Sequence, residues 1–292
     1  MALDQGPVVQ SAILRSTLTR LRKEMQLTQE QVADELEWSP SKLIRIEGGR
    51  SAVTKTDLDA LLNIYGVTSA SERDRLQELN RGAREKAWWD NYKNVLSPGV
   101  LSFAGYEAGA TFIRQFINNV IPGLLQTPDY ARVLTESTTT SSIMVAPVVN
   151  MRLERQKELA QRENPPHQFY ILDEAVIRRQ VGIKVDPAIM PSQLRYVADR
   201  AEQDERVFVR IIPFNEGAHL GVNVAGAFTL LEFDGGLPDL LYQDAGRGEV
   251  AAITGDDPEV SEYRYLFESL LDFTLSEEDS ISFVRAAAEE MS

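Results

Sequence analysis

The chain has 292 residues, 43% of them hydrophobic and 25% charged, which is the composition of a globular protein with room for two domains. It has no cysteine, and this excludes disulfides, thiolate metal sites and a cysteine nucleophile. The first residues lack a basic segment before an apolar one, and no apolar run is long enough to cross a bilayer. We therefore expect neither a signal peptide nor a membrane partner.

The net charge of −14 is unevenly distributed along the chain. Residues 1–90 hold 13 basic and 14 acidic side chains, whereas residues 91–292 hold 17 basic and 30 acidic ones. Residues 15–55 alone hold 8 basic and 6 acidic side chains. Because the local patch decides affinity for a polyanion, the first part can bind nucleic acid while the acidic part faces away from it. So weakly basic a patch should bind poorly alone, which favours a dimer on a two-part site.

Apolar residues at helical spacing predict five helices in the first part of the chain. The first covers Val9–Glu24, after a loose tail. The second and third make a tight pair within residues 28–50. Thr56 or Thr54 caps the fourth, which ends at Gly66, and Ser71 caps the fifth, which runs from Glu72 to about Glu85. These helices define an all-α bundle over residues 9–85.

The pair within residues 28–50 has the pattern of a helix-turn-helix. Thr28 and Gln31 form a capping box, Ser39 caps the second helix with Pro40 at its first position, and Gly48-Gly49 ends it. In the DNA-binding version of this motif, the second helix enters the major groove with its N-terminal residues facing the bases. The residues at that place are Pro40, Ser41, Lys42 and Arg45. The alternative for Lys42 and Arg45 is a solvated helix face.

The stretch from Leu18 to Val67 resembles the XRE family of lambda/434 repressor-like regulators. The resemblance rests on Leu27-Thr28-Gln29, Val32-Ala33, Ser39, Leu43 and Ile46-Glu47-Gly48-Gly49-Arg50. It implies that Gln29 contacts a phosphate from the start of its helix and that Arg50 contacts the DNA backbone. The predicted DNA-binding residues are Thr28, Gln29, Ser39, Pro40, Ser41, Lys42, Arg45 and Arg50.

Two positions depart from the family pattern. Glu37 stands in the turn where the family usually has glycine, so either the turn is looser or Glu37 adopts a left-handed conformation. Pro40 lacks a hydrogen-bonding side chain where the family often places a base reader. We therefore expect specificity to depend on Ser41, Lys42, Arg45 and DNA shape.

Residues 86–105 are predicted to bridge the two parts of the chain. They contain the adjacent tryptophans Trp88 and Trp89, which point to different sides of a helix. The first interpretation is a packing plug, and the alternative is that one of them lines a pocket. Leu96-Ser97-Pro98-Gly99 has the composition of a turn.

The rest of the chain, residues 106–292, is predicted to be a larger α+β domain with a mainly antiparallel sheet. Helices are predicted at 107–119, 128–134, 147–163 and 187–201, after Asp257 and after Ser276, and the Ser/Thr-rich segment 135–142 is predicted to be a mobile loop. Strands are predicted at 169–172, 207–212, 225–233 and 237–243, the last two joined by a hairpin turn at Asp234-Gly235-Gly236.

This second part resembles the C-terminal domain of actinobacterial antitoxin-like XRE regulators. The matching segments are Trp88-Trp89-Asp90, residues 121–131 (IPGLLQTPDYA), residues 152–156 (RLERQ), residues 171–175 (ILDEA) and Gln193-Leu194. The resemblance implies a regulator that is often paired with a small partner protein encoded nearby. It implies no enzymatic activity.

The residues themselves also give little support for catalysis. His167 and His219 do not have the spacing of metal ligands. Asp173 and Glu174 are adjacent and point apart, so shared acid–base work is not expected, and Glu174 fits the first turn of the helix that carries Arg178. No glycine loop followed by lysine is present to hold phosphates. We predict no enzyme, no catalytic residue, no cofactor and no metal.

Several charged and polar residues of the second part are candidates for binding a ligand or partner. Arg152, Arg155 and Gln156 share one helix face, which either pairs with the domain's own acids or anchors an anionic group. Glu107 and Arg178 have the same two interpretations. The candidate set is Trp88, Trp89, Glu107, Arg152, Arg155, Gln156 and Arg178.

Together these patterns predict a cytoplasmic, nucleoid-associated transcriptional regulator that binds a double-stranded DNA operator as a homodimer. Its second domain would receive a partner protein or a small ligand. The alternative is an antitoxin-like interaction protein that sequesters a small partner, with DNA binding serving autoregulation.

Overall fold

The computed structural model describes residues 5–139, 141–217, 221, 226–246, 249–254 and 257–292. The chain forms two compact units. The helical unit comprises Met1–Asp90 with Asp234–Leu237, and the sheet unit comprises Asn91–Phe233 with Pro238–Ser292.

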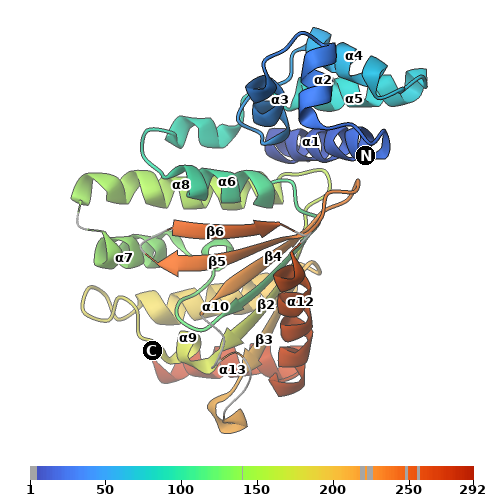
Figure 1. Ribbon diagram of the computed structural model, residues 1–292. Coiled ribbons are helices and arrows are strands. Elements are labelled where there is room, and N and C mark those ends of the chain that lie inside the picture. The colour runs from blue at the N-terminus through green and yellow to red at the C-terminus, as the bar shows by residue number, and fades with distance from the viewer. Residues whose placement is uncertain (1–4, 140, 218–220, 222–225, 247–248, 255–256) are drawn as a thin grey trace. The chain divides into compact units, whose positions relative to one another are not determined.

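The helical unit is built from helices around one small apolar core, as the sequence predicts. Its helices are α1 (Gly6–Glu24), α2 (Gln29–Glu35), α3 (Pro40–Glu47), α4 (Lys55–Ile64) and α5 (Ala70–Gly82), and the 3-10 turn η2 (Trp88–Tyr92) follows (Figure 1). Its fully buried leucines and isoleucines include Ile13, Leu18, Leu43, Ile46, Leu58, Leu61 and Leu62. The first helix begins at Gly6, three residues before the predicted start.

Side-chain caps fix most of the helix starts in this unit. The predicted capping box is present, since Thr28 Oγ1 accepts from Gln31 N and Gln31 Oε1 accepts from Thr28 N. Of the two residues considered for α4, Thr54 is the cap. For α5 the prediction of Ser71 as the cap is wrong. The cap is Ser69, which accepts from Glu72 N, and the helix begins at the next residue, Ala70. Ser39 precedes α3 but makes no side-chain cap bond.

Glu37 adopts the left-handed conformation in the turn between α2 and α3, with φ 55°. This answers the question raised by the missing glycine, because the turn keeps its shape and a residue with a Cβ occupies it. A left-handed residue with a side chain costs about 1 kcal/mol.

The sheet unit contains one six-stranded mixed sheet in the order β3-β2-β1-β4-β5-β6 (Figure 1). Its strands are β1 (Phe112–Ile117), β2 (His167–Asp173), β3 (Val207–Ile212), β4 (Phe228–Glu232), β5 (Leu240–Gly246) and β6 (Glu249–Thr254). Its helices and 3-10 turns are α6 (Pro98–Glu107), η3 (Gly123–Leu125), α7 (Pro128–Thr138), α8 (Ser142–Ala160), α9 (Glu174–Arg178), α10 (Ile189–Gln203), η4 (Phe214–Glu216), α12 (Pro258–Leu270), η5 (Leu271–Phe273) and α13 (Glu277–Glu290).

The predicted α+β class is confirmed, but the predicted mainly antiparallel arrangement is only partly right. β1 pairs with β2 and β2 with β3 in parallel, whereas β1–β4, β4–β5 and β5–β6 are antiparallel. The parallel half follows from the connections, because α7 with α8 and α9 with α10 are long crossovers that return the chain to the same end of the sheet. The hairpin between β4 and β5 is antiparallel, as predicted.

The largest error of the sequence prediction lies at residues 107–119, where a strand replaces the predicted helix. A helix does precede it, but α6 ends at Glu107 and β1 covers Phe112–Ile117. In this short run Ile113, Phe116 and Ile117 fit helical spacing while Ile113 and Ile117 also fit strand alternation, so periodicity alone does not separate the two. Parallel pairing with β2 and antiparallel pairing with β4 decide for the strand.

Smaller differences concern element ends. The predicted turn at 96–99 holds the N-cap Ser97 and the first residues of α6. The predicted mobile loop 135–142 is helical through Thr138 and again from Ser142, and α8 contains Pro147 rather than beginning with it. The predicted strand 225–233 is β4, and Ala225 lies outside the described residues. β6 was not expected.

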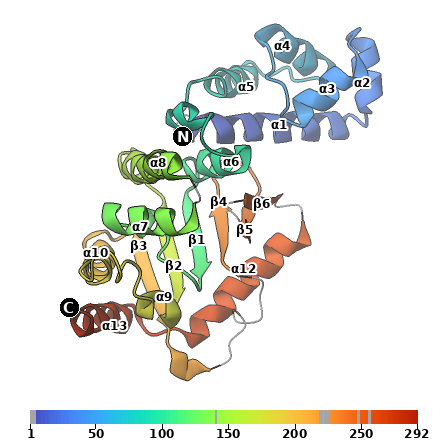
Figure 2. The same ribbon diagram turned by 90° about the vertical axis from the view of Figure 1, so that its left-hand side faces the viewer.

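Helices cover both faces of the sheet. One apolar cluster joins Ile113, Tyr170 and Leu231 of the strands to Leu159, Leu194 and Val284 of α8, α10 and α13. The opposite cluster joins Phe116, Ile171 and Phe228 to Leu266, Phe267 and Leu270 of α12. Figure 2 shows α7, α10 and α13 on one side of the strands and α12 on the other. Among the described residues, no helix combines the length and apolarity needed to span a membrane.

Candidate nucleic-acid interface and cavity

The N-terminal part of α3 presents a solvent-exposed surface. Ser39, Pro40, Ser41 and Arg45 are exposed, while Leu43 and Ile46 on the opposite side of the same helix are buried in the core. This division follows from the helical period, since Leu43 and Ile46 are three residues apart and share a face. The predicted base-facing residues therefore lie on the open side of α3.

The orientation of α3 is fixed by a buried ion pair at its C-terminal end. Both oxygens of Glu47 accept from Arg22 of α1, with Nε to Oε1 at 2.7 Å and Nη2 to Oε2 at 2.9 Å. Arg22 also donates to the carbonyl of Leu27, and Gln29 Nε2 donates to Glu47 Oε2 at 2.7 Å. Burial acts to lower the pKa of Arg22, but the hydrogen bond that Arg22 donates to Glu47 outweighs burial and raises this pKa. Gln29, predicted to contact phosphate, is thus engaged inside the unit.

Lys42 is also engaged. Its Nζ lies 2.7 Å from Asp57 Oδ1 of α4 and 3.7 Å from the centre of the Trp38 ring. Burial acts to raise the pKa of Asp57, but hydrogen bonds from Lys42 and Thr54 lower it overall. Lys42 is therefore held at the edge of α3 rather than extended into solvent.

Arg45 of α3 and Arg50, just after the helix, have no such restraint. Neither Arg45 nor Arg50 has a side-chain hydrogen bond or ion pair with the residues that the structure describes, and both are exposed. Gly49, between them, has φ 71°, and a Cβ there would lie 1.4 Å from Nη1 of Arg15. The absence of a side chain at Gly49 lets the guanidinium of Arg15 lie against this turn, which is close to Arg45 and Arg50 in the sequence of the motif.

Sequence reasoning missed Ile44 in this surface. This residue is 49% exposed and lies between Ser41 and Arg45 on α3. An apolar side chain at this place can contact the methyl group of thymine. The signal was available, because Ile44 does not share the core face of Leu43 and Ile46.

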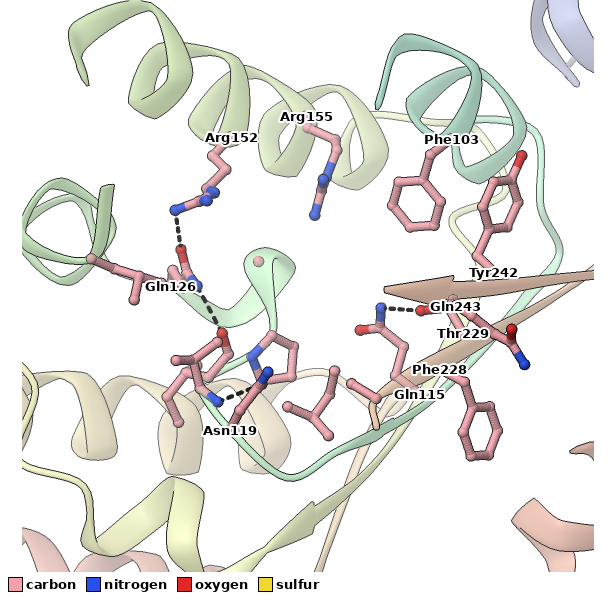
Figure 3. A pocket seen from close by; sticks show the side chains of 17 residues that line it. Phe103, Gln115, Asn119, Gln126, Arg152, Arg155, Phe228, Thr229, Tyr242 and Gln243 are labelled. Carbon is pink, nitrogen blue, oxygen red and sulfur yellow. Dashed lines mark hydrogen bonds between the residues drawn. The ribbon is translucent and has the colours of Figure 1, made fainter. Parts of the chain in front are cut away.

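The second candidate site is a cavity of about 270 Å³ in the sheet unit, here named the α8 cavity (Figure 3). Gln115 of β1, Thr229 of β4 and Tyr242 of β5 are in register across three strands and form its floor. Arg152 and Arg155 of α8 line it from the opposite side, and Phe103 of α6 closes one end. It lies at the end of β1 where the sheet changes from parallel to antiparallel pairing, and such switch points favour ligand sites in open sheets.

Arg155 makes an ion pair with a buried carboxylate. Its Nε lies 2.9 Å from Oε2 of Glu107, which is 0% exposed. The contact lacks hydrogen-bond geometry, so both Glu107 oxygens are without a hydrogen-bond donor among the described residues. Burial raises the pKa of Glu107, and the charge of Arg155 opposes this. Gly123 permits the close approach of the guanidinium, because a Cβ there would lie 2.6 Å from Arg155 Nη2.

Arg152 has only neutral partners. Its Nη1 donates to Gln126 Oε1 at 3.0 Å and to Thr135 Oγ1 at 3.3 Å. Burial, and then the charge of Arg155, lower the pKa of Arg152 to about 10. The described lining contains two guanidiniums and no carboxylate, and the nearest buried acid, Glu107, is already in contact with Arg155.

Three buried or half-buried glutamines brace the loop that forms one wall. Gln126 donates to the Ile121 carbonyl at 2.7 Å, and Gln156 donates to the carbonyls of Gly123 and Gln126 at 2.8 and 2.9 Å. Gln193 of α10 donates to the Leu125 carbonyl and accepts from Thr127 N. The structure thus brings together three of the segments on which the family resemblance rests, residues 121–131, 152–156 and 193–194.

The other predicted candidates lie elsewhere. Arg178 pairs with Glu174, at 3.0 Å, and with Glu290, and so joins α9 to α13. Trp89 is buried in the helical unit with its ring edge-on to Trp88, at 5.3 Å between centres. Neither tryptophan is among the described lining of the α8 cavity. No group of three or more potential metal ligands occurs among the described residues.

Comparison with known families identifies both units. Residues 13–76 match a helix-turn-helix domain family, which supports a DNA-binding regulator. Residues 100–286, more than half of the chain, match the family described as a domain of unknown function (DUF5753). No curated protein and no solved structure matches significantly. The chain therefore belongs to the DUF5753 family and carries a helix-turn-helix domain ahead of the family's own domain.

Proposed function

We propose that this protein is a sequence-specific transcriptional regulator of the XRE type that binds operator DNA as a homodimer through α3. The observation that carries the proposal is the exposed face of α3, where Arg45 has no partner among the described residues while Leu43 and Ile46 fix the helix to the core. An arginine held in this way can make a bidentate contact with guanine. The proposal includes no catalytic activity.

The dimer is proposed from charge and from the motif. Residues 15–55 carry only two more basic than acidic side chains, 8 against 6. A single patch of this kind makes few phosphate contacts, whereas two copies on half-sites one helical turn apart double them. The acidic sheet unit adds nothing to phosphate affinity.

The proposal is tested by Arg45→Ala in the full chain, with operator fragments selected from genomic DNA by footprinting. Specific binding should weaken by about 1–3 kcal/mol while binding to random DNA changes little, because the lost contact reads a base. Arg81→Ala is the matched control, since Arg81 is an exposed arginine of α5 in the same unit. Unchanged discrimination between operator and random DNA in Arg45→Ala would reject α3 as the reading helix.

Salt dependence gives a second test. Affinity for the operator should fall steeply as salt rises, because bound arginines and lysines displace counterions from the phosphates. A flat response would show that the helix-turn-helix is not the DNA surface.

For the sheet unit we propose the reception of a signal. The α8 cavity favours a small ligand as that signal, because it holds two arginines in a concave space of about 270 Å³, close to the size of a small-molecule site. The antitoxin-like alternative predicts that a small protein encoded nearby is retained stoichiometrically by the tagged chain. Retention of that protein by wild type would favour the alternative over a ligand-controlled regulator.

A further inference from the structure

The α8 cavity contains a positive charge that the protein leaves without a carboxylate. Arg152 is bonded to the amide oxygen of Gln126 and the hydroxyl of Thr135, and it has no ion pair with the described residues. Arg155 adds a second guanidinium, which Glu107 offsets at 2.9 Å. A buried charge with only neutral partners is costly unless an opposite charge joins it. The site therefore lacks one negative charge.

A second feature of the same space is the amide oxygen of Gln115, which has no hydrogen-bond partner among the described residues. Gln115 is 8% exposed, and its Nε2 donates to Thr229 Oγ1 at 2.7 Å. Its Oε1 is buried and has no hydrogen-bond partner among the described residues. Arg155 and Gln115 point toward the same space from opposite sides (Figure 3). A buried acceptor without a hydrogen bond is unfavourable, so we expect a donor group of a ligand to lie at this oxygen.

The rest of the lining combines apolar and polar side chains. Phe103 of α6, Leu134 of α7 and the ring of Tyr242 of β5 supply apolar surface, and Asn119 and Gln126 supply amides. A volume of about 270 Å³ is close to the lower end of small-molecule sites, which begin at about 300 Å³. This size suits a metabolite with one ring or a short chain.

We propose that the α8 cavity binds a small organic monocarboxylate that also carries a hydrogen-bond donor and an apolar body. The carboxylate contacts Arg152 and Arg155, the donor contacts Gln115 Oε1, and the apolar body packs against Phe103. The role of this ligand as a signal rests on the regulatory function proposed above. The binding of the ligand rests only on the residues of the cavity.

The charge balance favours one carboxylate over a doubly charged phosphate. Two arginines and Glu107 leave one uncompensated positive charge, so a monoanion neutralises the site. A dianion would leave an excess negative charge beside the buried Glu107, which is unfavourable at low dielectric.

The test uses 4-hydroxyphenylacetate as probe, because it has one carboxylate, one hydroxyl donor and one ring. Its neutral relative 4-hydroxyphenylacetamide and inorganic phosphate are the comparisons. Binding to the full chain is measured by ligand-observed NMR and by titration calorimetry, with an expected Kd of about 1 mM or below for the acid. The amide and phosphate should bind at least about tenfold more weakly.

Gln115→Glu is the decisive variant. It keeps the size of the side chain and can accept from the Thr229 hydroxyl, but its carboxylate supplies the one negative charge that the cavity lacks, so the charge of the ligand becomes surplus. Binding of the acid should weaken by at least about tenfold. Gln168→Glu is the matched control, because Gln168 is 7% exposed on the neighbouring strand β2, accepts from Tyr170, and lies outside the described lining. The Gln168→Glu variant should bind the acid with the same affinity as wild type.

Arg152→Met is the second variant, in case Gln115→Glu does not fold, and it should lose the preference for the acid over the amide. Absence of binding to wild type at about 10 mM, equal binding of acid and amide, or unaltered binding in Gln115→Glu would overturn the proposal. DNA binding is measured on the same samples. Loss of probe binding with intact operator binding rejects only the cavity, and the reverse rejects only the DNA-binding function.

Discussion

The buried pair Arg22–Glu47 of the helical unit and the buried pair Arg155–Glu107 of the sheet unit are built differently. In the helical unit, Arg22 meets Glu47 with two hydrogen bonds, and Gln29 adds a third to the same carboxylate. In the sheet unit, Arg155 meets Glu107 at 2.9 Å, but neither carboxylate oxygen of Glu107 has a hydrogen-bond donor among the described residues.

The difference is whether the hydrogen-bonding groups of the buried pair are all satisfied within the protein. A buried pair stabilises a fold when its remaining lone pairs and protons are satisfied, and it destabilises one when they are not. The pair at Glu47 is satisfied and sits between α1 and α3, where it sets the angle of the helix proposed to read DNA. The pair at Glu107 is under-satisfied, and its arginine, Arg155, lines the α8 cavity.

The largest effect is expected from Arg22→Met. It removes the partner of a carboxylate whose side chain is 6% exposed, so the free energy of unfolding of the helical unit should fall by about 3 kcal/mol. All 3 tryptophans, Trp38, Trp88 and Trp89, belong to this unit, so tryptophan fluorescence in urea follows its unfolding in the full chain. Arg20→Met is the control, because the Arg20–Glu24 pair is more than half exposed and should contribute less than about 0.5 kcal/mol.

The direct comparison of the two pairs is Glu47→Gln against Glu107→Gln. Glu47→Gln weakens charged hydrogen bonds and should lower the free energy of unfolding by about 2 kcal/mol. Glu107→Gln breaks no hydrogen bond to the carboxylate among the described residues, because neither oxygen of Glu107 has a donor there, so its effect should be less than half as large. Fluorescence reports the first variant, and far-ultraviolet circular dichroism reports the second. Equal losses in the two variants would remove the distinction between the pairs.

The smallest effect is expected from Lys42→Met, in the half-exposed pair with Asp57. The pKa of Asp57 should rise toward 3.8, because the hydrogen bond and charge of Lys42 help to hold it below that value. When a carboxylate has a lower pKa in the folded state than in the unfolded state, it stabilises the fold at pH values above the unfolded-state pKa. This stabilisation is lost as the pH falls through the folded-state pKa. The variant should therefore lose about 0.5 kcal/mol near neutral pH and nothing at the lowest pH. Carbon-detected NMR titration of Asp57 measures the shift, and a pKa equal to that of wild type would contradict the assignment.

Local signals were sufficient for much of the helix-turn-helix. The capping box at Thr28 and the buried pair Leu43 and Ile46 depend on residues close in sequence, so spacing and residue type specify them. The sequence left open the conformation of Glu37 and the choice between Thr54 and Thr56 as cap, and the structure decides both. The partners of Gln29 and Lys42 could not be foreseen, because Glu47 and Asp57 come from other helices.

The sheet unit was harder to predict for the same physical reason. The apolar run of β3 and the hairpin between β4 and β5 are local and were found, whereas the pairing of β1 with β2 and β4 is not. Arg152 and Arg155 were chosen from helical spacing within α8. Gln115, Thr229 and Tyr242 were missed, because only strand register brings them into one row.

The row of Gln115, Thr229 and Tyr242 also has a consequence for the order in which folding and ligand binding can occur. The helix-turn-helix is one contiguous stretch of about twenty residues, whereas the α8 cavity collects side chains from Phe103 to Gln243. Its floor exists only after segments more than a hundred residues apart have paired, such as Gln115 with Thr229. A ligand there would meet the finished sheet unit and never a nascent or partly folded one. Ligand binding would therefore act as a check that the unit is complete, and it would stabilise that unit as a whole against unfolding.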